Sequence, residues 1–194
     1  MSYDLIFLLE EPSIDNVLKT ILPKIIPETV SFICIPHQGK QDLAKSIPNK
    51  IKAFKQFSPK TQFIIVHDQD SNDCKELKSD LLEICQRAGT ANVMIRIVCH
   101  ELESWFLGDL AAVEKAYNLK PDTLSKKQDN KKYRNPDRLS TAKQELKNLV
   151  KEYYAGTHSR KIAPHMSLTE NKSQSFQVFI KGIHKVLGGV DRSD

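Results

Sequence analysis

Residues 61–73 read TQFIIVHDQDSND, an apolar run that ends abruptly in acidic and polar residues. The first part, residues 61–66, predicts a strand that is apolar on both faces, as in the middle of a parallel sheet. In an open parallel sheet, ligands bind beyond the carboxyl ends of the strands. The residues from His67 to Asp73 therefore mark both the end of a buried strand and the place where a functional site is expected.

The N-terminal half repeats this arrangement of strand followed by helix. Further strands are predicted at residues 3–9, 29–35 and 92–99, and apolar residues at helical spacing separate them. The first helix is expected to begin near Ile14, with Ser13 as its cap. Alternating strands and helices are typical of a parallel sheet with helices on its faces. We therefore predict an α/β fold with a parallel four-stranded sheet and helices on both faces.

The pattern changes after about residue 117. Residues 120–134 are polar and predict a loop, and Asn135-Pro136 opens a helix whose apolar face runs to Tyr153. A last helix is expected over residues 173–187. We predict one domain overall, in which residues 1–117 form a metal-binding α/β core and residues 118–194 form a basic helical C-terminal extension packed on it.

The composition is that of an ordinary soluble globular protein, with 40% hydrophobic and 27% charged residues among 194. No apolar run approaches the roughly 20 residues that span a bilayer, and the stretch after Asp4 lacks the basic residues of a signal peptide. The four cysteines form no CxxC pair, which indicates free thiols in a reducing compartment. We therefore expect a cytoplasmic location. ATP hydrolysis is not expected, because no Gly-rich phosphate loop is present.

The net charge of +5 is unevenly distributed. The segment from Lys120 to Lys161 holds 12 Lys and Arg against 5 Asp and Glu, which fits a polyanion-binding face or simply a solvated helix face. Two features suit contacts with nucleic-acid phosphates that are independent of the base sequence. One is Lys40 in a polar loop, and the other is a stripe of lysines spaced four positions apart. The stripe consists of Lys143, Lys147 and Lys151, and a solvated face explains it equally well.

Acidic residues follow three of the four predicted strands: Glu10, then Asp68 and Asp70, then Glu101 and Glu103. If extended geometry persists beyond the third strand, Asp68 and Asp70 point to the same face roughly 6–7 Å apart. A hard divalent cation would turn their repulsion into attraction, and oxygen ligands favour Mg²⁺, Mn²⁺ or Ca²⁺ over zinc. The alternative is a solvent-exposed turn.

The remaining polar residues near these strand ends have two interpretations each. Glu101 and Glu103 would hold a second cation or orient a water, or else only favour the positive end of a helix. His67 and His100 would shuttle protons or only donate hydrogen bonds. Asp73 and Asp109 are better explained as helix caps.

These residues resemble a known family. Glu at the end of the first strand and Asp-x-Asp at the end of a later one resemble the Toprim domain of topoisomerases, primases and OLD-type nucleases. The whole chain is similar to bacterial proteins of the DUF4276 family. The matching pieces are LLEEPSIDNVLKTILPKI, PHQGKQDL, VHDQDSNDC, HELESWFLGDLAAVEKAY and NPDRLSTAKQEL.

The resemblance implies a Toprim-like (Rossmannoid) fold and a nuclease or phosphotransfer site that uses one or two Mg²⁺ or Mn²⁺ ions. In that pattern Glu10 is the general acid/base and also a metal ligand, while Asp68 and Asp70 bind metal. The family usually has Gly after the first Glu, whereas this chain has Glu11; a carboxylate there would hinder the close approach of a phosphate.

Three functions follow as expectations. The leading one is a Mg²⁺-dependent phosphodiesterase acting on DNA or RNA, and the resemblance links some relatives with a partner ATPase in phage defence. The second is a catalytically inactive module that binds nucleic acid or a partner through the helical extension. The third is an enzyme acting on small nucleotides with the same ions. A homo-oligomer is compatible with each of them.

Overall fold

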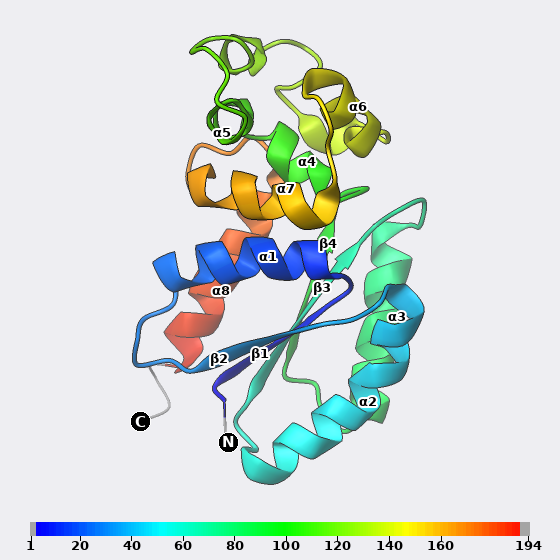
Figure 1. The fold of residues 1–194 in the computed structure, drawn as a ribbon. Helices are drawn as coiled ribbons and strands as arrows, with labels where there is room; N and C mark the ends of the chain where they lie inside the picture. The colour runs from blue at the N-terminus through cyan, green and yellow to red at the C-terminus, as the bar shows by residue number, and fades with distance from the viewer. Residues whose placement is uncertain (1–2, 191–194) are drawn as a thin grey trace.

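Four parallel strands form the centre of the molecule in the computed structural model, which describes residues 3–190. The strands are β1 (Leu5–Leu9), β2 (Phe32–Pro36), β3 (Gln62–Asp68) and β4 (Val93–Val98). Their order in the sheet is β2-β1-β3-β4, so β4 is an edge strand (Figure 1). This confirms the predicted fold class.

Helices cover both faces of the sheet (Figure 1). Successive side chains of β1 point to opposite faces: Leu5, Phe7 and Leu9 join one hydrophobic cluster, and Ile6 and Leu8 join the other. The first cluster also contains residues of α1 (Pro12–Ile21) and α8 (Gln174–Val190), and the second contains residues of α2 (Lys40–Phe57) and α3 (Cys74–Arg87). All five β1 residues are fully buried, as expected for a strand covered on both sides.

Residues 103–165 build a helical layer on the α1 side of the sheet (Figure 1). Its helices are α4 (Glu103–Leu107), α5 (Leu110–Ala116), α6 (Ala142–Leu149) and α7 (Ala155–Ile162). Its short 3₁₀ turns are η2 (Ser125–Lys127), η3 (Pro136–Arg138) and η4 (Ala163–His165). Outside the layer, the turn η1 (Leu22–Lys24) follows α1. Trp105 packs against Phe176 and Phe179 of α8, with ring centroids 5.1 and 5.3 Å apart. The larger hydrophobic cluster therefore runs without interruption from the sheet into this layer.

Several local predictions are confirmed and others are wrong. Asp73 caps α3 by accepting hydrogen bonds from two backbone N–H groups, and Asp109 caps α5. Ser13 does not cap α1: Glu11 occupies the cap position, and the Ser13 hydroxyl donates a hydrogen bond to the Glu11 carboxylate. None of the helices within residues 3–190 has the length and apolar character that crossing a membrane requires.

The single helix predicted from Asn135 to Tyr153 is also wrong. The chain forms η3, becomes extended at Leu139 and then enters α6, which ends at Leu149. Long-range bonds override the helical pattern here, because the Asp137 carboxylate accepts hydrogen bonds from the Ser173 hydroxyl and the Ser175 backbone N–H. The apolar positions after Leu149 instead lead into α7, which the pattern did not predict.

Gly108, between α4 and α5, is predicted to be essential for packing. A Cβ at this position would overlap the Asn171 side chain and lie 2.7 Å from the Ser173 backbone nitrogen. We expect Gly108→Ala to lower the free energy of unfolding by about 1–3 kcal/mol, because backbone has to move. Gly156→Ala is the matched control, since nothing lies within 4 Å of its Cβ position. Urea unfolding of both variants tests this; equal effects would contradict it.

Candidate active site

The ends of β1 and β3 meet through Glu10. These strands are neighbours, with Leu9 in register with Val66, so the residues that follow them lie side by side. Glu10 Oε2 accepts a hydrogen bond from the Asp68 backbone N–H at 2.9 Å, and it lies 3.0 Å from His67 Nδ1. The structure therefore brings Glu10 and Asp68 together, as the sequence predicted.

His67 and Glu10 form a buried ion pair. The two oxygens near His67 Nδ1, Glu10 Oε2 and the Asp68 carbonyl at 2.5 Å, are both acceptors, so Nδ1 carries the proton. Burial acts to raise the pKa of Glu10, but the hydrogen bond and charge of His67 outweigh it, and the pKa lies below 4.5. Burial acts to lower the pKa of His67, but Glu10 outweighs it, and the pKa lies above 6.5. The pair keeps Glu10 ionised.

Asp68 is a buried carboxylate surrounded by other carboxylates. Its Oδ2 accepts a 3.3 Å hydrogen bond from the Leu102 backbone N–H, while Oδ1 has no hydrogen-bond partner among the described residues. Burial, followed by the negative charges of Glu11, Glu10 and Glu103, holds the pKa of Asp68 well above 3.8. A carboxylate in these surroundings is costly unless a positive charge compensates it.

Glu103, the first residue of α4, extends this cluster. Its side chain is 3% exposed, and Oε1 has no hydrogen-bond partner within residues 3–190; Lys143 Nζ lies 3.9 Å away. Burial raises the pKa of Glu103, although the charge of Lys143 opposes the shift. Burial and then the charge of Glu103 raise the pKa of the neighbouring Tyr153 hydroxyl.

Asp70 lies apart from this buried cluster. The strand ends at Asp68 and the backbone turns at Asp70, whose φ is 51°, so the extended geometry that would align the two aspartates does not persist. The Asp70 side chain is 45% exposed and lies 3.7 Å from Lys40 Nζ. It borders a hollow of about 440 Å³ that is also lined by Gln69, Ser71, His100, Glu101 and Ser140.

The predicted phosphate-binding lysines divide into two groups. Lys40 contacts Asp70, and Lys143 reaches Glu103 while its backbone N–H donates to Glu101 Oε2 at 2.9 Å. Lys143 therefore borders the acidic cluster, and the charge of Lys40 also helps to lower the pKa of Glu10. Lys147 and Lys151 are exposed, and Lys151 lies beyond the end of α6, so the three lysines do not form one helical stripe.

Residues 9–184 match the family described as "Domain of unknown function (DUF4276)". The chain belongs to this family. A search of curated proteins found no match. Among solved structures, the DUF4276 chain is similar to the C-terminal region of the Burkholderia pseudomallei OLD protein, with a TM-score of 0.51 and 13% identity over 94% of this chain and 99% of that one. This likeness supports a Toprim-like fold.

Two residues of the DUF4276 site were not predicted from the sequence. Glu11 supplies the largest charge that raises the pKa of Asp68, although the sequence suggested only that it would hinder phosphate approach. Tyr153 lies beside Glu103, although its spacing predicted an apolar helix face. The position of Glu11 next to Glu10, just beyond the end of β1, was an available signal, whereas Tyr153 reaches the site only through tertiary packing.

The residues present fit a divalent cation in their chemistry. Asp68 Oδ1 and Glu103 Oε1 are buried carboxylate oxygens without hydrogen-bond partners in the described chain, and carboxylate oxygens are the ligands that Mg²⁺ and Mn²⁺ prefer. In this side-chain arrangement, no three His, Cys, Asp or Glu residues within 3–190 are grouped as a ready ligand set. Cation binding would therefore require side-chain rearrangement around Asp68.

Proposed function

We propose that this DUF4276 chain is a divalent-metal-dependent phosphodiesterase that acts on nucleic acid. The observation that carries the proposal is the buried Asp68, whose Oδ1 lacks a hydrogen-bond partner among the described residues while three other carboxylates raise its pKa. Such a cluster at the carboxyl ends of parallel strands is where an α/β protein places a ligand. A cation is the ligand that offsets the repulsion.

Asp68 and Glu10 are the proposed central ligands, with Asp70 completing the set that the Toprim resemblance implies. Glu103 and Glu101 would serve a second ion. When bound, a divalent cation supplies Lewis acidity toward phosphate oxygens and toward water.

Glu10 is proposed as the proton acceptor. Its pKa is lowered, so it is ionised near neutral pH, which is the form that a general base requires. The hydrogen bonds from His67 and from the Asp68 backbone fix its Oε2. Oε1 is the oxygen that these bonds leave for a water.

The substrate phosphate is proposed to lie in the hollow beside Asp70. Lys40 of α2 and Lys143 of α6 flank the acidic residues. Their ammonium groups attract phosphates whatever the base sequence of the nucleic acid.

A cleavage assay tests the proposal. Supercoiled DNA, linear DNA and RNA are each incubated with Mg²⁺ or Mn²⁺ and with the parent, Glu10→Gln or Asp68→Asn. We expect cleavage by the parent and a loss of about 100-fold or more in both variants, since each removes a carboxylate that acts on the reacting phosphate. Asp80→Asn, an exposed position on α3, is the matched control. Cleavage that persists undiminished in Glu10→Gln and Asp68→Asn would contradict the proposal.

One observation favours a second candidate, a catalytically inactive module that binds nucleic acid or a partner ATPase. Glu11 stands near Asp68, where a glycine would leave room for phosphate. For this candidate we expect the parent to bind labelled DNA or RNA without cleaving it, and binding to survive Glu10→Gln. Appearance of cleavage in Glu11→Gly alone would identify Glu11 as the cause of inactivity. A role in phage defence rests on the resemblance only.

A further inference from the structure

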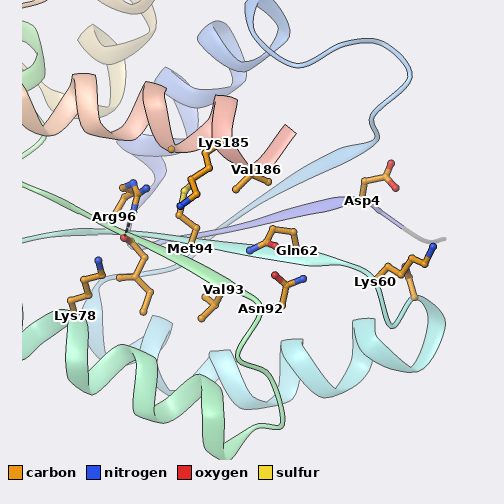
Figure 2. Close-up of a pocket in the computed structure, with 13 residues that line it drawn as sticks. Asp4, Lys60, Gln62, Lys78, Asn92, Val93, Met94, Arg96, Lys185 and Val186 are labelled. Carbon is orange, nitrogen blue, oxygen red and sulfur yellow. Dashed lines mark hydrogen bonds between the residues drawn. The ribbon is translucent and has the colours of Figure 1, made fainter. Parts of the chain in front are cut away.

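A second hollow of about 560 Å³ lies along the edge strand β4, between α8 and α3 (Figure 2). Its lining includes Gln62, the first residue of β3, and Asn92, which immediately precedes β4. It therefore extends toward the amino ends of the strands, whereas the carboxylate cluster lies at their carboxyl ends. The two sites share no lining residue.

Basic side chains from three different elements line this hollow, Lys78 on the α3 side of β4 and Arg96 and Lys185 on its α8 side (Figure 2). Lys78 comes from α3, Arg96 from β4 and Lys185 from α8 (Figure 2). Within residues 3–190, none of the three has a carboxylate within ion-pair distance. Asp4 also lines the hollow, but its Oδ2 accepts hydrogen bonds from the Ser31 backbone N–H at 2.8 Å and from the Ser31 hydroxyl at 2.6 Å. The hollow is thus positively charged.

Arg96 is the central group. Its Nη1 donates a hydrogen bond to its neighbour's carbonyl, Ile95 O, at 2.9 Å, and its Nε is buried with no partner among the described residues. Burial lowers the pKa of the guanidinium. A partly buried guanidinium without a counter-charge is unfavourable, and its planar fork of donors matches the oxygens of a phosphate or carboxylate.

Gly182 of α8 holds Arg96 in this position. A Cβ at residue 182 would overlap Arg96 Nη2 and would lie 2.7 Å from both Arg96 Nε and Met94 Sδ. The absence of a side chain lets α8 pack directly over the guanidinium. Because the obstructing atoms are the ends of flexible side chains, an added methyl group would displace the guanidinium rather than the backbone.

We propose that this hollow binds a nucleoside phosphate, with the phosphate on Lys78, Arg96 and Lys185. Val93, Met94 and Val186 supply an apolar surface beside these charges for the organic part (Figure 2). The volume lies in the range of about 300–1,000 Å³ found for small-molecule sites. Pairing of β4 with β4 of a second copy is disfavoured, because it would bring two sets of these basic residues together.

Equilibrium dialysis with ATP, AMP and pyrophosphate tests the proposal in the presence of EDTA, which keeps divalent ions from the carboxylate site. We expect saturable binding of ATP and AMP by the parent. Lys78→Gln, Lys185→Gln and Arg96→Gln should each weaken it about 10-fold, the effect of one charge-assisted hydrogen bond. Lys52→Gln, an exposed position on α2 outside the hollow, should leave binding unchanged. The first two variants are at exposed positions, so the test does not depend on the folding of Arg96→Gln.

Gly182→Ala adds a readout that loss of charge cannot explain. It removes no basic residue, yet we expect it to weaken ATP binding about as much as Arg96→Gln, because it displaces the Arg96 guanidinium. The double variant should bind ATP no more weakly than Arg96→Gln alone. The proposal is overturned if the parent binds neither ATP nor AMP, or if Lys52→Gln weakens binding as much as Lys78→Gln. Binding of a hexaglutamate peptide or of an oligonucleotide, without binding of either nucleotide, would also overturn it.

Discussion

Asp68→Asn is expected to abolish metal-dependent cleavage and, without divalent ions near pH 7, to raise the free energy of unfolding. The substitution removes a buried carboxyl group whose ionisation is opposed by burial and by the charges of Glu11, Glu10 and Glu103, and it keeps an oxygen for the Leu102 N–H. We expect a gain on the order of 1 kcal/mol or more, since an uncompensated buried charge opposes folding. Urea unfolding in EDTA measures it, with Asp80→Asn as the control.

The sign of the pH dependence follows from the raised pKa of Asp68. The Asp68 carboxyl group binds a proton more tightly in the folded state than in the unfolded chain. Its contribution to the free energy of unfolding is therefore fully present below pH 3.8 and is lost as pH rises through the folded pKa. Asp68→Asn should therefore flatten the decline in stability above about pH 4. A variant that is less stable than the parent at every pH would contradict this account of Asp68.

Glu10→Gln is expected to act on stability in the opposite direction. It breaks the ion pair with His67, whose side chain is 3% exposed, and we expect a loss of about 1–3 kcal/mol together with the loss of cleavage. Because the pKa of Glu10 is lowered, its contribution to the free energy of unfolding is present above pH 4.5 and is lost as pH falls through the folded pKa. Because the pKa of His67 is raised, its contribution to the free energy of unfolding is present below pH 6.5 and is lost as pH rises through the folded pKa.

The destabilisation by Glu10→Gln should therefore be largest from about pH 4.5 to 6.5 and should shrink on either side. Unfolding curves for the parent and the variant across this range measure it. Asp80→Asn, at an exposed position on α3, controls for the general effect of replacing a carboxylate by an amide. A loss that does not vary with pH would mean that the pair is not ionised.

The sheet and the convergence of Glu10 with Asp68 were predictable from the sequence because both follow from strand direction. Apolar runs that end in acidic residues place those residues at one edge of any parallel sheet. Glu101 and Glu103 reach the same edge for this reason. The separation of Asp70 from Asp68 was not predictable, because it depends on a single backbone turn with φ of 51°.

The helical layer was less predictable, because distant contacts determine it. Asp137 binds the start of α8 and ends the helical pattern near Leu139, and Tyr153 reaches Glu103 only after that break. Neither contact leaves a periodic pattern in the sequence. The same applies to the β4 hollow, where Gly182 and Arg96 lie far apart in the sequence and meet in space.

Binding of Mn²⁺ to the carboxylate cluster is the central claim, and electron paramagnetic resonance of free Mn²⁺ during titration with protein measures it directly. The account predicts saturable uptake of one or two ions by the parent and by Asp80→Asn, and loss of at least one ion in Asp68→Asn. Uptake that is the same in the parent and in Asp68→Asn, or no uptake by the parent, would contradict it.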